Sequence, residues 1–110
     1  MIEIKNVTFH YSGLNQAGLS DFNLSVTDGE CVLLCGASGC GKTTVTRLIN
    51  GLIPHFFKGE LSGDIYVNGK RVDIKNPQDA VDAGIGYLSE DRKRYGVIIE
   101  KTVAENTTMA

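Results

Sequence analysis

A chain of 110 residues with 42% hydrophobic content is long enough for one small domain with a marginal core, and its composition is not that of a disordered protein. A net charge of -2 and a pI near 5.6, without any block of basic residues, exclude a nucleic-acid partner on electrostatic grounds. No apolar run approaches the roughly 18 residues that a membrane span needs, and residues 1–5 lack the pattern of a secretory signal, so a cytoplasmic location is expected.

The first predicted elements are two strands, one bracketed by Ile2 and Tyr11 and one marked by the alternation of Phe22, Leu24 and Val26. A loop over residues 12–18 is expected to join them. The apolar run at residues 31–35 is predicted to be a fully buried strand, with its two cysteines, Cys31 and Cys35, acting as small core residues.

The residues that follow this run read GASGCGKT and match the phosphate-binding pattern G-x-x-x-x-G-K-[ST], ahead of a short helix predicted over residues 44–50. Glycines let the backbone come close to phosphate oxygens, and the N–H groups point inward at the positive helix end. Lys42 would reach the outer phosphates, the Thr43 hydroxyl would coordinate Mg²⁺, and Thr44 would contact the inner phosphates. The predicted nucleotide-binding residues of the loop are Gly36, Ala37, Ser38, Gly39, Cys40, Gly41, Lys42, Thr43 and Thr44.

The stretch from residue 52 to residue 63 is predicted to be irregular, with His55, Phe56 and Phe57 covering the core. Residues 64–67 and 70–73 should form a hairpin around the strong turn signal Asn68-Gly69. That hairpin is expected to lie beside the two N-terminal strands.

The last third of the chain begins with a helix start, because Asn76 is a good cap and Pro77 suits the first helical position. Residues 85–89 are predicted to be a second buried strand, and the charged residues 90–96 an exposed loop. A capping box that begins at Thr102 predicts a final helix. No linker divides the chain, so residues 1–110 are predicted to form a single domain.

Several stretches resemble the ATP-binding subunit of ABC transporters. Three of these stretches look like the ATPases of energy-coupling-factor importers of cobalt and vitamins: IKNVTFHY, GASGCGKTT and NGLIPHFFKGELSG. Two later stretches look more like the second ATPase domain of sugar importers: NPQDAVDAGIGYLSEDRKRYGV and TVAENTTMA. This change of resemblance suggests a chimera with a seam near residues 68–73. The resemblance implies an α/β fold: the N-terminal part of an ABC-type P-loop NTPase domain, with an antiparallel β subdomain packed beside a partial parallel core sheet.

The resemblance also implies roles for two residues outside the loop. Tyr11 would stack on adenine; the alternative is a tyrosine at a strand end that packs on the segment that follows it. Glu90 would approach the Mg²⁺ ion, although it can equally be a plain solvated charge. The implied cofactors are ATP and Mg²⁺. The implied partners are transmembrane transporter subunits and a second ATPase copy, with the protein peripheral to the cytoplasmic membrane.

The family's signature loop, catalytic glutamate and switch histidine would lie beyond Ala110, so no catalytic residue is predicted and little turnover is expected of this chain alone. Open apolar sheet edges should favour self-association. The leading hypothesis is the ATP-binding part of an ATPase that couples ATP binding and hydrolysis to solute transport. The alternative is a non-catalytic structural or chimeric fragment that retains a phosphate-binding loop.

Overall fold

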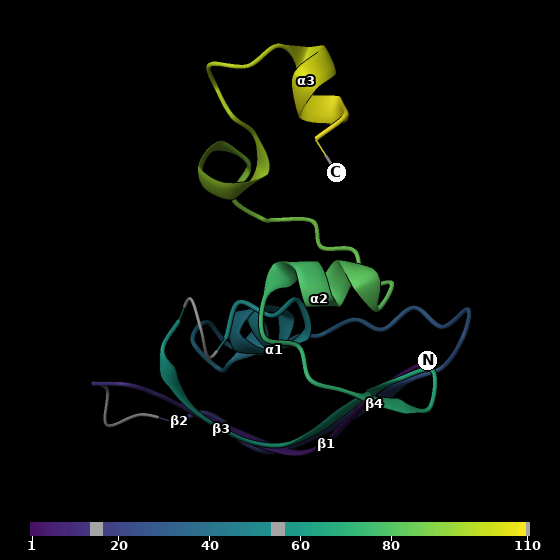
Figure 1. Cartoon of the computed structure of the whole chain (residues 1–110). Helices are drawn as coiled ribbons and strands as arrows, with labels where there is room; N and C mark the ends of the chain where they lie inside the picture. Colours follow the sequence, from purple (N-terminus) through teal and green to yellow (C-terminus); the bar gives the residue numbers. More distant parts are fainter. Residues whose placement is uncertain (14–16, 54–56, 110) are drawn as a thin grey trace.

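The computed structural model describes residues 1–13, 17–53 and 57–109. A four-stranded antiparallel sheet in the order β2-β1-β3-β4 forms one layer, and the helix α1 lies on one face of it (Figure 1). The strands are β1 (Ile2–Tyr11), β2 (Ala17–Val26), β3 (Gly59–Val67) and β4 (Lys70–Val72). The helices are α1 (Lys42–Ile49), α2 (Pro77–Asp82) and α3 (Val103–Thr107), with a single π-helical turn, η1 (Arg92–Gly96), before the last.

The sheet confirms the predicted N-terminal strands and the hairpin beside them. β3 pairs with β1 and turns into β4 at Asn68-Gly69, where both residues have positive φ. The prediction that residues 59–63 are irregular is wrong: they belong to β3, because residues 59–62 pair with residues 8–11 of β1. Residues 14–16 of the expected loop, and His55 and Phe56, lie outside the described residues.

A bulge in β1 keeps its apolar side chains on one face of the sheet. Ile4 and Val7 are three positions apart, so a regular strand would point them to opposite faces, yet both are buried. The register between β1 and β3 shifts between Lys5 and Thr8, and Asn6 inside this shift has a φ of 50°. The extra residue turns Val7 back toward the core.

Gly63 of β3 lies opposite this bulge, and we expect Gly63→Ala to destabilise the fold by about 2 kcal/mol or more. Its φ is 97°, and a Cβ atom there would lie 2.5 Å from the Asn6 carbonyl oxygen and 2.7 Å from the Val7 Cα. Gly29→Ala is the matched control, since its φ of 76° carries the same backbone strain with no described atom within 4 Å of the added Cβ. Equal urea midpoints for the two variants would show that the close approach adds nothing.

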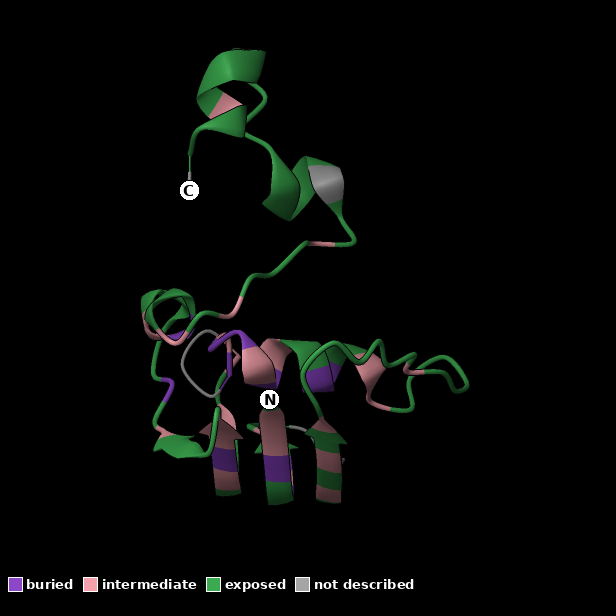
Figure 2. Ribbon diagram, turned by 90° about the vertical axis from the view of Figure 1, so that its right-hand side faces the viewer, coloured by how far each residue is buried: buried purple, intermediate pink, exposed green. Residues whose placement is uncertain are grey.

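The core lies between the sheet and α1. Thr44, Val45 and Leu48 form the buried stripe of α1, at the spacing of a helix face that packs on a sheet. Figure 2 shows the buried residues concentrated in these two layers, while the C-terminal part of the chain is almost entirely exposed. The largest fully buried side chains are those of Phe9, Ile4, Leu48, Ile53 and Val7.

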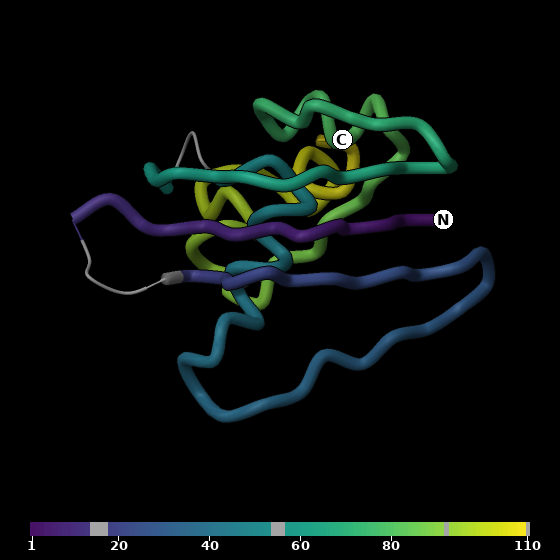
Figure 3. Tube along the Cα trace, turned by 90° about the horizontal axis from the view of Figure 1, so that it is seen from below, coloured from purple at the N-terminus to yellow at the C-terminus, as the bar shows by residue number. Residues whose placement is uncertain are grey.

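The two strands predicted for the parallel core sheet are not formed within the described residues. Residues 31–35 and 85–89 run without regular secondary structure, and Cys31 and Cys35 are exposed, contrary to their predicted burial. Leu33 and Leu88 are 84% and 94% exposed. A buried strand needs neighbouring strands to bond its backbone and cover its side chains, and neither segment has one among the described strands. Figure 3 shows the chain after β2 running as a wide loop outside the sheet.

Local signals predicted α2 and α3 correctly, whereas the loop expected over residues 90–96 contains the π-helical turn η1. The Asn76 side chain accepts a hydrogen bond of 3.0 Å from the Asp79 N–H, and Pro77 begins α2. Thr102 and Glu105 form the predicted capping box at the start of α3. The hydrogen bonds from Thr102 lower the pKa of the Glu105 carboxyl group. α3 has no buried residue and stands away from the sheet (Figure 1).

Candidate functional site

The glycine-rich loop at residues 36–41 connects the exposed 31–35 segment to α1. Gly39 and Gly41 have φ values of 81° and 105°, a region that side chains with a Cβ rarely adopt. The Cys40 N–H donates to the Ala37 carbonyl at 3.2 Å and closes the turn between them. The loop therefore needs glycine at these two positions of the pattern for conformational reasons.

The start of α1 is not capped by any side chain. Its N-cap residue is Gly41, which has no side chain to accept a hydrogen bond, and the first turn contains no acidic residue. By contrast, α2 and α3 are capped by Asn76 and Thr102. The amide groups of a helix start that lack internal partners attract anions, and the helix dipole adds to this attraction. The first turn of α1 is therefore suited to an anionic ligand.

The Lys42 ammonium group lies inside the loop that it follows. Its Nζ atom donates to the carbonyl oxygens of Gly36 at 2.7 Å and Ala37 at 2.8 Å, and it lies 3.6 Å from the Cys40 Sγ. These contacts hold a positive charge against the first residues of the loop. A phosphate group, as a stronger acceptor, can exchange with the two carbonyls for this ammonium group.

The sheet holds the helix start in place through two contacts. Gly41 packs so closely on β2 that a Cβ atom there would lie 2.9 Å from the Gly18 carbonyl oxygen. The Tyr11 hydroxyl, at the end of β1, forms a hydrogen bond of 2.9 Å with the Thr44 Oγ1. The sequence predicted that Tyr11 contacts adenine and that Thr44 contacts the inner phosphates. It did not predict their mutual bond, since no local signal joins residues so far apart in the chain.

Lys42, Thr43 and Glu90 line the same hollow, of about 1060 Å³, between α1, α2 and the segment after residue 85. Thr43 and Glu90 are exposed, as a site open to ligand requires. Sequence reasoning missed one pair of side chains in this hollow. The Arg47 guanidinium group lies 3.9 Å from the centre of the Phe57 ring.

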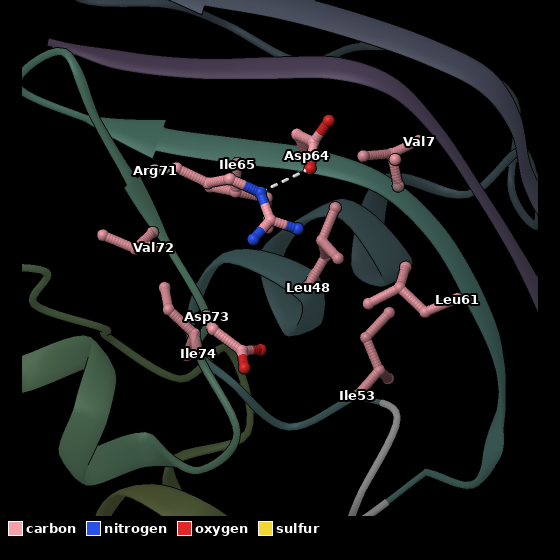
Figure 4. A pocket seen from close by; sticks show the side chains of 11 residues that line it. Val7, Leu48, Ile53, Leu61, Asp64, Ile65, Arg71, Val72, Asp73 and Ile74 are labelled. Carbon is pink, nitrogen blue, oxygen red and sulfur yellow. Dashed lines mark hydrogen bonds and ion pairs between the residues drawn. The ribbon is translucent and has the colours of Figure 1, made fainter.

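A second hollow, of about 70 Å³, lies between β3, β4 and α1 (Figure 4). Arg71 at its rim donates from Nε to the Asp64 Oδ1 at 2.6 Å, and this hydrogen bond raises the pKa of the guanidinium group. Pockets for nucleotide-sized ligands have volumes of about 300–1,000 Å³, so this hollow is too small for one.

Within residues 1–13, 17–53 and 57–109 no three His, Cys, Asp or Glu side chains gather closely enough to hold a metal ion. None of the helices in the described part of the chain has the length and apolar character needed to cross a membrane.

The glycine-rich loop, its lysine and the uncapped helix that follows are those of the P-loop class of nucleotide-binding domains. The family model described as "ABC transporter" matches residues 19–110, and the chain belongs to this family. The antiparallel sheet and few helices fit an N-terminal part of the family's ATP-binding domain, which confirms the expected fold class, although the parallel core sheet is not formed within the described residues.

Curated relatives carry related names. A putative ABC transporter ATP-binding protein of Treponema denticola is 55% identical over 84 residues, which cover 74% of this chain and 17% of the relative. A putative ribose/galactose/methyl galactoside import ATP-binding protein of Agrobacterium fabrum is 42% identical over 96% of this chain and 20% of its own length. A xylose import ATP-binding protein of Thermoanaerobacter pseudethanolicus is 36% identical over 99% of this chain and 21% of its own length. The chain thus spans about a fifth of the relatives it matches.

Proposed function

We propose that this chain binds Mg·ATP at residues 36–44 and serves as the ATP-binding part of a transport ATPase, in which a longer protein couples ATP hydrolysis to solute movement. One observation supports this above all: the Lys42 ammonium group is bonded inside the loop that precedes the uncapped start of α1, and Gly39 and Gly41 of that loop are left-handed. That arrangement offers both amide donors and positive charge to a polyphosphate.

Each predicted residue then has a role toward the nucleotide. Lys42 and the loop amides bind the outer phosphates, Thr44 contacts the inner ones, and the Tyr11 ring stacks on adenine. Thr43 and Glu90, which line one hollow with Lys42, hold the Mg²⁺ ion. The ion would neutralise charge on the phosphate oxygens.

The assembly proposed for the intact protein follows its relatives, two of which are named as import ATP-binding proteins. We propose that it works with transmembrane subunits and a second ATPase copy at the cytoplasmic face of a membrane. Residues 1–110 then form a single, incomplete domain. The exposure of Leu33 and Leu88 supports the expectation that this chain alone self-associates.

We also propose that the chain joins two kinds of importer ATPase near residues 68–73, the first like the energy-coupling-factor type and the second like the sugar-importer type. Two observations support this proposal: the different sequence motifs before and after residues 68–73, and the position of these residues in the fold. Asn68 and Gly69 are exposed at a hairpin tip, the kind of site that tolerates exchange of flanking segments.

Calorimetric titration with ATP tests the proposed function. We expect binding that weakens when EDTA removes Mg²⁺, and Glu90→Gln should reduce the Mg²⁺-dependent gain by about two- to fivefold, the size of an exposed charge contact. Glu100→Gln is the matched control, because Glu100 is also exposed and does not line the hollow. Absence of heat at millimolar ATP would overturn the proposal and favour a structural fragment that merely retains the loop.

A further inference from the structure

The hydroxyl groups of Tyr11 and Thr44 form a pair at the junction of β1 and α1. Their oxygen atoms are 2.9 Å apart, and Thr44 is only 6% exposed. The Tyr11 ring is held in place by its neighbours. It meets the Phe9 ring edge-on, at 4.7 Å between centroids and 80° between planes, and it lies so close to Gly18 that a Cβ atom there would be 2.8 Å from its Cε2. The position of the tyrosine hydroxyl is therefore well defined.

We propose that Tyr11 is a positioning residue for phosphate binding, whose hydroxyl donates to the Thr44 Oγ1 and so directs the Thr44 hydrogen toward an inner phosphate of the bound nucleotide. This inference rests on the proposed function. It gives Tyr11 a role that depends on its hydroxyl and is separate from any contact of its ring with the base.

The direction of the bond follows from what each group can donate and accept. A hydroxyl group has one hydrogen to donate and two lone pairs to accept with, whereas a phosphate oxygen only accepts. When Thr44 binds a phosphate, it donates its one hydrogen to the phosphate oxygen. Tyr11 is then the donor in the bond between the two hydroxyl groups. The two bonds then form a chain, and each polarises the other in a buried setting.

Other helical threonines of this chain show what Thr44 would do without Tyr11. Thr46 donates to the Thr43 carbonyl at 2.9 Å, and Thr107 donates to the Val103 carbonyl at 2.7 Å. A threonine hydroxyl in a helix readily turns back to a carbonyl one turn earlier. The bond with Tyr11 offers Thr44 a different partner and leaves its hydrogen available to a ligand.

Inorganic tripolyphosphate separates the hydroxyl from the ring, because it offers phosphates without a base to stack on. We expect Tyr11→Phe, which keeps the ring, to weaken tripolyphosphate binding by about three- to tenfold, the worth of one hydrogen bond. Thr44→Val should cause a loss of similar size, and the double variant should lose little more than either single one. Thr44→Ser, which restores a hydroxyl, should recover most of what Thr44→Val loses.

Tyr66→Phe is the matched control, since Tyr66 lies on β3 and contacts Lys5. It should leave tripolyphosphate affinity unchanged. If the unaltered chain binds tripolyphosphate and Tyr11→Phe binds it equally well, the inference is wrong while the proposed function stands. If the unaltered chain binds neither ATP nor tripolyphosphate, the inference and the proposed function are both wrong. Circular dichroism checks that each variant folds. If Tyr11→Phe does not fold, the Thr44 variants still test the inference, because equal tripolyphosphate affinities of Thr44→Ser and Thr44→Val would overturn it.

Discussion

Replacing Lys42 by methionine is expected to weaken ATP binding by about 10- to 100-fold, because a charge-assisted hydrogen bond contributes about 1.5–3 kcal/mol. Methionine keeps much of the length of the side chain but removes the ammonium group that lies 2.7 Å from the Gly36 carbonyl oxygen in the loop. Titration with a fluorescent ATP analogue, with and without Mg²⁺, measures the loss. The effect should persist without Mg²⁺, since the lysine charge acts on the phosphates directly.

Lys70→Met provides the control for this experiment. Lys70 is an exposed residue of β4 and does not line the hollow shared by Lys42 and Glu90, so its replacement removes the same charge elsewhere. The Lys42 variant also loses its bonds to the loop carbonyls, so its unfolding should be measured alongside. Equal ATP affinities for the two variants would mean that the loop does not bind phosphate.

The largest effect on stability is expected from Phe9→Ala, at about 3–5 kcal/mol. Phe9 has no exposed surface, packs edge-on against Tyr11, and lies so close to Gly59 that a Cβ atom there would be 2.6 Å from its Cζ. A truncated side chain would leave a cavity that this tightly fitted region cannot fill. Small domains have only about 5–15 kcal/mol of net stability, so much of it would be lost. Urea unfolding followed by circular dichroism measures the change.

Leu88→Ala is the control for Phe9→Ala, because Leu88 is also a large apolar residue but is 94% exposed. Its replacement should change the free energy of unfolding by less than about 0.5 kcal/mol. Similar losses for both variants would place the core of the molecule around the 85–89 segment instead of between the sheet and α1. The Phe9 variant should also bind tripolyphosphate more weakly, since the Tyr11 ring loses its support.

Features with a local physical cause could be predicted from the sequence. The Asn68-Gly69 turn, the Asn76 cap and the Thr102 capping box each depend on residues within a few positions of one another, and all three are present. The Gly36–Thr43 pattern likewise leads into a helix as expected, with Gly39 and Gly41 in left-handed conformations. The binding roles of its residues remain predictions.

Features that depend on distant partners could not be predicted in this way. The apolar run at residues 31–35 has the composition of a buried strand, but a strand exists only where another strand bonds to it, and none of the described strands does. The irregular stretch predicted up to residue 63 became part of β3 for the opposite reason, since β1 supplied a partner. Composition alone does not contain this information.

The sequence by itself determined the turns, the helix caps, the phosphate-loop pattern and the alternation of the N-terminal strands, because each arises from the conformational preferences of neighbouring residues. Only the tertiary structure decided that Ile4 and Val7 share a face, that Lys42 lies inside its loop, and that the Tyr11 and Thr44 hydroxyls meet. Those relations depend on how the sheet and α1 pack in three dimensions, and side-chain contact is set by that packing rather than by separation along the chain.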